Sequence, residues 1–244
     1  MRIVILGYTG LLGESILKYL KKNTSYNIIC VGRSIKKKNF QNSKIKYYQW
    51  DFNTFTKSKL LFLNKANIII NCVGKINNNN NDLQYVNVIF LKKLLKYFYT
   101  YKLKTRFINL SSVSVYGRAQ DYLGQSKLIS EVSDIKINDL YSKSKFKGDL
   151  LIKNMVKKKS YKNFSFTILR ISNVFGKKNN SNLYKFVLFF LKIRLWVQSS
   201  TKVMFNFVNV NDVSQAVMLV ISKLDISKNK IYIVSDDCRQ SKLY

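Results

Sequence analysis

The stretch that decides the fold is Arg2-Ile-Val-Ile-Leu6 followed by Gly7-Tyr-Thr-Gly10-Leu-Leu-Gly13. A short apolar run, glycines at every third position and then a helical pattern predict a strand, a tight turn and a helix in immediate succession. Gly7 permits the turn, Gly10 lets a pyrophosphate approach the backbone, and Gly13 lets the helix pack closely on the strand. Because the first N–H groups of a helix bind phosphates well, the stretch predicts a dinucleotide-binding turn.

Apolar runs alternate with helical patterns along the rest of the chain. This order predicts an α/β fold with a doubly wound parallel sheet and right-handed crossovers. Strands are expected at 2–6, 27–32, 45–48, 67–73, 105–111, 164–171 and 231–234. Helices are expected at 11–22, 55–64, 82–100, 140–158 and 183–194. The lysine run 36–38 and the asparagine run 77–81 are expected to be surface loops.

Tyr141 and Lys145 stand four residues apart, so both can point from one helix face into one site. A free phenol has a pKa of about 10, which is too high for a base at neutral pH. A neighbouring ammonium lowers the pKa of the phenol, and the protonated phenol can in turn donate to a carbonyl. The alternative is a solvated helix face in a chain rich in Tyr and Lys.

Composition excludes several kinds of site. The chain has 244 residues, 47% of them hydrophobic, with three cysteines and no histidine. The scattered cysteines and the absence of C-x-x-C and histidine argue against a metal site, a His-based triad and a disulfide framework. We therefore assign no metal ligand and expect a reducing, cytoplasmic compartment.

The formal charge of +31 would attract polyanions. The lysines are spread through the chain, however, and the dominance of Asn, Ile, Tyr, Phe and Lys without proline suits an AT-rich gene. We expect no specific nucleic-acid partner, although a phosphate-bearing substrate would be attracted. No apolar run is long enough to span a membrane. Residues 183–197 could form a basic amphipathic helix on an anionic membrane, but a helix packed in a substrate lobe is preferred.

Six motifs occur in one order along the chain. They are Gly7–Gly13, Asn71-Cys-Val-Gly74, Ser111-Ser-Val-Ser-Val-Tyr-Gly117, Tyr141 with Lys145, Leu169-Arg-Ile-Ser-Asn-Val-Phe-Gly176 and Phe207-Val-Asn-Val-Asn-Asp-Val213. The series resembles the extended short-chain dehydrogenase/reductases, which include nucleotide-sugar epimerases, dehydratases and reductases of polysaccharide biosynthesis. The resemblance implies an NAD(P)-binding Rossmann domain over 1–171. It also implies a compact substrate-binding lobe over 172–244, interleaved with the last sheet strands, and admits a homodimer.

The resemblance also implies a cofactor site. NAD-selective relatives usually carry an acid near Gly32 for the ribose hydroxyls. Arg33 stands there instead and suits a 2′-phosphate, so we expect NADP, with NAD as the alternative. The other interpretation of Arg33 is one more surface cation. The residues expected at the cofactor are Gly7, Gly10, Leu11, Leu12, Gly13, Arg33, Asp51, Phe52, Cys72, Val73, Gly74, Asn87, Tyr141 and Lys145.

Catalysis is expected from Tyr141, Lys145 and Ser112, with Ser112, Ser114 and Asn173 at the substrate. Dehydratases of the family place Asp-Glu after the hydroxyl residue, where this chain has Val113-Ser114, which argues against a 4,6-dehydratase. Phe205 replaces an arginine that often binds the nucleotide diphosphate.

We therefore expect an NAD(P)-dependent oxidoreductase that reduces a keto group of a sugar, in particular a nucleotide 4-keto-6-deoxysugar. An epimerase would use the same residues. A non-catalytic NAD(P)-binding regulatory or assembly module is the third interpretation, which the intact Ser112, Tyr141 and Lys145 set disfavours.

Overall fold

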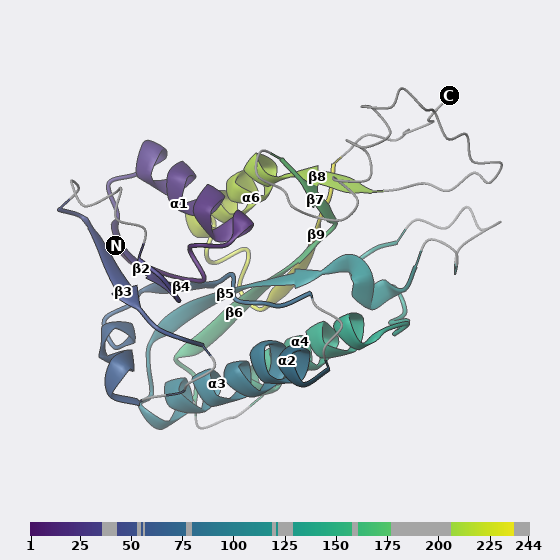
Figure 1. Ribbon diagram of the computed structural model, residues 1–244, viewed down its shortest axis with the longest axis horizontal. Helices are drawn as coiled ribbons and strands as arrows, with labels where there is room; N and C mark the ends of the chain where they lie inside the picture. The colour runs from purple at the N-terminus through teal and green to yellow at the C-terminus, as the bar shows by residue number, and fades with distance from the viewer. Residues whose placement is uncertain are drawn as a thin grey trace.

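The computed structural model describes residues 1–35, 43–52, 55, 57–76, 80–118, 121, 129–157, 161–176 and 206–236. Within these ranges seven parallel strands form the main sheet in the order β3-β2-β1-β4-β5-β6-β9 (Figure 1). They are β1 Arg2–Leu6, β2 Asn27–Gly32, β3 Ile45–Gln49, β4 Ile68–Asn71, β5 Thr105–Ser112, β6 Phe164–Ile171 and β9 Lys230–Val234. The strand order reverses between β1 and β4, which defines a doubly wound Rossmann sheet. The predicted fold class is confirmed.

Helices cover both faces of this sheet. On one face lie α1 Leu11–Asn23 and α6 Val210–Ser222, and on the other lie α2 Asn80–Gln84, α3 Phe90–Thr100 and α4 Leu140–Val156 (Figure 1). Successive side chains of β1 pack on opposite faces of the sheet. Ile3 and Ile5 belong to the hydrophobic core under α1 and α6, whereas Val4 and Leu6 belong to the core under α3 and α4. Because both faces are buried, the central strands read as unbroken aliphatic runs.

A second, two-stranded parallel sheet follows β6 in the chain. It pairs β7 Asn173–Phe175 with β8 Phe207–Asn209, with Asn173 opposite Phe207. α6 starts directly after β8 and is tied to α1, because the Ser15 Oγ atom donates to the Val210 carbonyl (3.2 Å) and accepts from the Ser214 hydroxyl (2.8 Å). Within the described part of the chain, no helix is both long and apolar enough to cross a membrane.

Several predicted boundaries were wrong. The helix expected at 55–64 is a 3-10 helix, η2 Lys57–Leu63, and the helix expected at 82–100 begins at Asn80 and contains a π-helical turn, η3 Tyr85–Ile89. Asn80 and Asn81 are therefore helical rather than loop. The strand expected at 67–73 spans only 68–71, and α6 was not predicted. The expected loop 36–38, residues 77–79, the expected helix 183–194 and Phe205 lie outside the described residues.

Candidate active site

The glycine turn joins β1 to α1. Gly7 has a positive φ of 81°, and its N–H donates to the Val31 carbonyl of the neighbouring strand (2.8 Å). A Cβ at Gly13 would lie 2.3 Å from the Gly7 carbonyl oxygen, so only glycine lets α1 approach the turn this closely. Gly10 is the N-cap of α1 and offers no side chain, and a Cβ there would meet only the Gly7 oxygen, at 3.5 Å. The start of α1 thus leaves room for a ligand beside Gly10.

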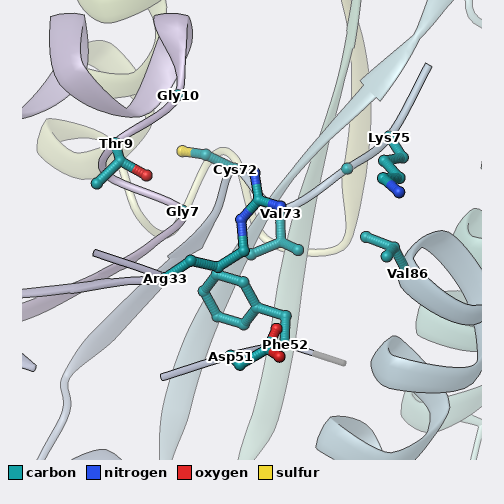
Figure 2. A pocket seen from close by; sticks show the side chains of 11 residues that line it. Gly7, Thr9, Gly10, Arg33, Asp51, Phe52, Cys72, Val73, Lys75 and Val86 are labelled. Atoms are coloured by element: carbon teal, nitrogen blue, oxygen red, sulfur yellow. The ribbon is translucent and has the colours of Figure 1, made fainter. Parts of the chain in front are cut away.

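A pocket opens beside this turn, where the strand order reverses. Figure 2 shows its lining, into which the Arg33 side chain points. Aromatic and aliphatic side chains share the lining with two cations and one carboxylate. The lining residues are Gly7, Thr9, Gly10, Arg33, Asp51, Phe52, Cys72, Val73, Gly74, Lys75 and Val86. A mixed apolar and cationic pocket next to a helix N-terminus has the chemistry that a dinucleotide requires.

Most of the residues expected at the cofactor therefore line one pocket, but not all of them do. Leu11, Leu12 and Gly13 form the first turn of α1 instead, where Leu12 packs against the core, and the lining also lacks the predicted Asn87, Tyr141 and Lys145. Thr9, Lys75 and Val86 were not predicted. Thr9 stands inside the glycine motif and Lys75 follows Gly74, so position alone was an available signal for these two.

Arg33 and Cys72 differ in their surroundings. Arg33 is exposed, and its carbonyl accepts a hydrogen bond from the Gln49 Nε2 atom (3.0 Å), which fixes the backbone just after β2. Burial raises the pKa of the Cys72 thiol to about 12, opposed by the charge of Lys145. The thiol is therefore protonated at neutral pH and presents a neutral wall to the pocket.

Asn87 links the pocket to α4. It lies within the π-helical turn η3 and is buried. Its Nδ2 donates to the Ser144 Oγ atom of α4 (2.9 Å) and to the Lys75 carbonyl (3.1 Å), while its Oδ1 accepts from the Lys75 N–H (3.0 Å). The amide thus fixes the turn after β4 against α4. A π-helical turn at a functional position is a recurrent feature of helices.

Tyr141 and Lys145 project from the first turns of α4. The Lys145 ammonium donates to the Leu110 carbonyl of β5 (3.1 Å) and lies 5.9 Å from the Tyr141 ring centroid. A Cβ built on Gly74 would be 3.0 Å from the Lys145 Nζ atom. Gly74 lines the pocket, so the ammonium lies close to the pocket wall as well as near the Tyr141 ring.

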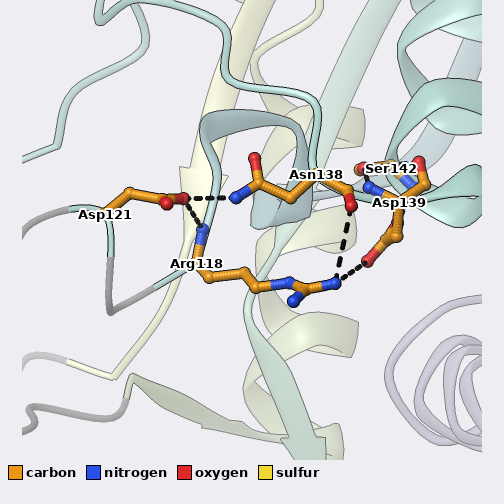
Figure 3. A network of polar contacts seen from close by, with 5 residues as sticks. All are labelled: Arg118, Asp121, Asn138, Asp139 and Ser142. Atoms are coloured by element: carbon orange, nitrogen blue, oxygen red, sulfur yellow. Dashed lines mark hydrogen bonds and ion pairs between the residues drawn. The ribbon is translucent and has the colours of Figure 1, made fainter.

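The start of α4 is fixed by a capping box. The Asp139 carboxylate accepts from the Ser142 N–H (2.7 Å), and the Ser142 hydroxyl accepts from the Asp139 N–H (3.2 Å). Figure 3 shows that Arg118, from the segment after β5, reaches the Asp139 carboxylate (3.9 Å). Asp121 accepts from the Arg118 N–H and from Asn138 Nδ2, both at 2.6 Å, and these bonds, led by the one from Arg118, lower the pKa of Asp121. The first turn of the helix that carries Tyr141 is therefore stabilised by its own capping box and by Arg118 of the segment after β5.

The predicted substrate residues follow β5 and β6. Ser112 ends β5 and caps a 3-10 turn, η4 Val113–Tyr116, where its Oγ accepts from the Ser114 N–H (3.2 Å). The Ser114 hydroxyl is buried and has no hydrogen-bond partner among the described residues. Asn173 is exposed at the start of β7, and its Nδ2 donates to the Asn206 carbonyl (3.3 Å).

Fold and site together define a Rossmann protein with a pocket of the chemistry that a dinucleotide requires and a Tyr–Lys pair beside it. The sequence profile of the NAD dependent epimerase/dehydratase family matches residues 3–235, and the chain belongs to this family of enzymes. No protein with curated function matches the chain in sequence.

Solved structures of similar fold include three that hold NAD or a nucleotide sugar. The UDP-glucuronic acid 4-epimerase of Bacillus cereus, with UDP-glucuronic acid and NAD, has a TM-score of 0.78 at 18% identity over 96% of this chain and 77% of its own. The UDP-glucose 4-epimerase of Thermotoga maritima, with UDP-glucose, has a TM-score of 0.75 at 18% identity, over 96% of this chain and 77% of its own. The dTDP-glucose 4,6-dehydratase of Streptomyces venezuelae, with NAD, has a TM-score of 0.77 at 17% identity, over 96% of this chain and 75% of its own.

Proposed function

We propose that this chain is an NADP-preferring reductase that acts on the keto group of a nucleotide-linked sugar, in particular a nucleotide 4-keto-6-deoxysugar. The observation that carries the proposal is the Lys145 ammonium, which lies near both the pocket wall at Gly74 and the ring of Tyr141. Bound in this pocket, a nicotinamide cofactor would supply the hydride for the reduction.

The glycine turn and the pocket residues would hold that cofactor. The N–H groups at the start of α1 would bind its pyrophosphate, and the apolar face of Phe52 would contact its adenine. Arg33 would bind the 2′-phosphate of NADP with its fork of N–H donors. The close contact of Gly13 with Gly7 supports this assignment, because it leaves the helix N-terminus directly beside the pocket.

Three side chains would act on the substrate. Tyr141 would give its phenolic proton to the forming alkoxide, and the positive charge of the Lys145 ammonium would stabilise the phenolate that remains. The Ser112 hydroxyl would donate to the carbonyl oxygen, which stabilises negative charge where it develops. The Ser114 hydroxyl, which has no hydrogen-bond partner among the described residues, and the exposed Asn173 amide are suited to bind the sugar and its phosphates.

A nucleotide-sugar 4-epimerase is the second candidate. Two of the three similar structures described above are 4-epimerases, and an epimerase would use the same Tyr–Lys pair. An elimination of water fits less well, because Val113 and Ser114 offer no carboxylate after Ser112. The two candidates differ in cofactor use, since a reductase consumes NADPH while an epimerase regenerates its cofactor in each turnover.

The test is turnover against a panel of nucleotide sugars and nucleotide keto-sugars, with NADPH loss followed by absorbance and products by chromatography. Tyr141→Phe keeps the ring and removes the hydroxyl, so it should lower kcat at least about a hundredfold while cofactor affinity is retained. Ser112→Ala should lower kcat with little effect on cofactor binding, and Lys145→Ala should weaken both. Conversion of a nucleotide sugar to its epimer without loss of NADPH would refute the reductase proposal and support the epimerase. Full activity of Tyr141→Phe would refute catalysis at this site and favour the binding-module interpretation.

A further inference from the structure

A buried ion pair lies behind the candidate active site and takes no part in the proposed chemistry. Asp149 of α4 accepts from the Nε atom of Arg170 in β6 (3.1 Å), and the two side chains are only 1% and 3% exposed. Asp149 follows Lys145 by four residues, one turn further along the same face of α4. Burial raises the pKa of the Asp149 carboxyl, and the Arg170 guanidinium opposes that shift.

The Arg170 guanidinium also contacts Tyr116. Its Nη1 atom donates to the Tyr116 hydroxyl (2.6 Å), and its centre lies 4.8 Å from the Tyr116 ring centroid. Tyr116 is fully buried, and its hydroxyl donates to the Glu131 carbonyl (3.2 Å). Tyr116 closes η4, the turn whose N-cap is Ser112. One guanidinium thus contacts both the helix that carries Tyr141 and Lys145 and the turn that begins at Ser112.

We infer that Asp149, Arg170 and Tyr116 are positioning residues that set the distance between Ser112 and the Tyr141–Lys145 pair; the catalytic part of this inference rests on the proposed function. Three secondary-structure elements meet at Arg170, and a planar fork of donors fixes direction as well as distance. An apolar trio of equal volume would hold the fold together without fixing that direction.

The energetics favour geometry over stability as the role of this trio. Desolvation of two buried ions offsets much of their attraction, so a buried pair is weak evidence for added stability. Catalytic geometry is far more sensitive, because a displacement of about 1 Å can lower a rate about a hundredfold. Ser112 and Tyr141 would have to reach the same carbonyl oxygen from different elements, and such a site needs a rigid connection between those elements.

Tyr116→Phe tests the inference with the smallest change, and Tyr161→Phe is its matched control. Both tyrosines are buried. The Tyr161 variant loses one neutral hydrogen bond, which costs about 1 kcal/mol of stability, whereas the Tyr116 variant also loses a bond from a charged guanidinium, which costs about 1.5–3 kcal/mol, so stability is measured for both. Tyr161 donates to the Leu103 carbonyl (2.7 Å), just before the amino end of β5 and away from the pocket. Tyr116→Phe should lower kcat about tenfold or more with cofactor Kd within about twofold, while Tyr161→Phe leaves kcat unchanged. Equal effects of the two variants on kcat would overturn the inference.

The ion pair between Asp149 and Arg170 is tested with Asp149→Asn and Arg170→Lys. Asp149→Asn should lower kcat and also weaken cofactor binding, because it releases the helix that carries Lys145. Arg170→Lys keeps the charge and loses the fork, so it should not restore the wild-type kcat. A wild-type kcat in Arg170→Lys would show that charge alone suffices, which contradicts a positioning role.

A readout without substrate separates this inference from the proposed function. With 3-fluorotyrosine at position 141, Asp149→Asn should move the ¹⁹F resonance, and Tyr161→Phe should leave it in place. If the wild type turns over no nucleotide sugar, the proposed function fails, while the ¹⁹F shift still decides whether the trio positions Tyr141. An unmoved resonance in Asp149→Asn would refute the connection through α4.

Discussion

Gly13→Ala is the sharpest test of the glycine turn. The added Cβ would lie 2.3 Å from the Gly7 carbonyl oxygen and 2.8 Å from the Tyr8 Cα atom, and both neighbours are backbone. No side chain can rotate away, so α1 must move by about 1 Å from the turn. Overpacking of this kind costs about 1–3 kcal/mol, and a backbone clash belongs at the upper end. Helix propensity returns up to about 1 kcal/mol, which leaves a net loss of about 2 kcal/mol.

Gly10→Ala is the matched control three residues away. Its Cβ would meet only the Gly7 oxygen at 3.5 Å, an ordinary contact, and the backbone at φ −76° and ψ 167° suits alanine. Alanine is a poorer N-cap than glycine, so we expect a loss of less than about 1 kcal/mol. Its methyl group, however, would stand where the pyrophosphate approaches. Both variants should therefore bind cofactor at least about tenfold more weakly, a loss of about 1.4 kcal/mol of binding free energy, and only Gly13→Ala should lose substantial stability.

Urea unfolding followed by tryptophan fluorescence measures the stability difference, because Trp50 is buried in the core beside Phe52. Cofactor titration by fluorescence measures the affinity. If Gly13→Ala is as stable as Gly10→Ala, the close contact between α1 and the turn does not determine the packing, and the argument from Gly13 is wrong.

Two further predictions concern the pocket. Arg33→Ala should weaken NADPH binding much more than NADH binding in parallel titrations, because only NADPH carries the 2′-phosphate; equal losses would make Arg33 a surface cation. Because the pKa of Cys72 is raised to about 12, little thiolate exists at pH 8. Iodoacetamide should therefore label Cys72 at least about a hundredfold more slowly than a free thiol, with a rate that rises as the pH approaches 12; labelling at the free-thiol rate, measured by peptide mass spectrometry, would contradict the burial.

The sequence predicted the central strands well because each carries its own signal. Buried parallel strands are continuous aliphatic runs, as Ile68–Ile70 is, and such runs need no knowledge of their neighbours. The three-residue strands β7 and β8 carry no such signal, since their pairing joins segments far apart in sequence. α6 was missed because its residues from Val217 to Ile221 are all apolar, and such an unbroken run resembles a buried strand as much as a helix.

The site residues also fall into those with a local sequence signal and those that depend on the tertiary fold. Gly7, Gly10 and Gly13 were readable because the turn is local in sequence. The pairing of Asp149 with Arg170 was not, because it depends on α4 lying across β6. The only local hint was an acid four residues after Lys145 in a strongly basic chain. Asn87 was named from the family pattern, but nothing in the sequence indicated the π-helical turn that carries it.

The position of β9 also determines when the site can be completed during synthesis. β4, β5 and β6 extend the sheet from β1 in the order in which they leave the ribosome: β4 pairs with the free edge of β1, β5 with that of β4 and β6 with that of β5. Among the described residues, the outer edge of β6, from Thr167 to Ile171, pairs only with Lys230–Val234. Until those residues emerge, the nascent chain exposes an unpaired strand edge, which is a template for aggregation. Arg170 lies in that strand, so the bridge between the two halves of the candidate active site becomes rigid only after the last strand of the sheet has been made.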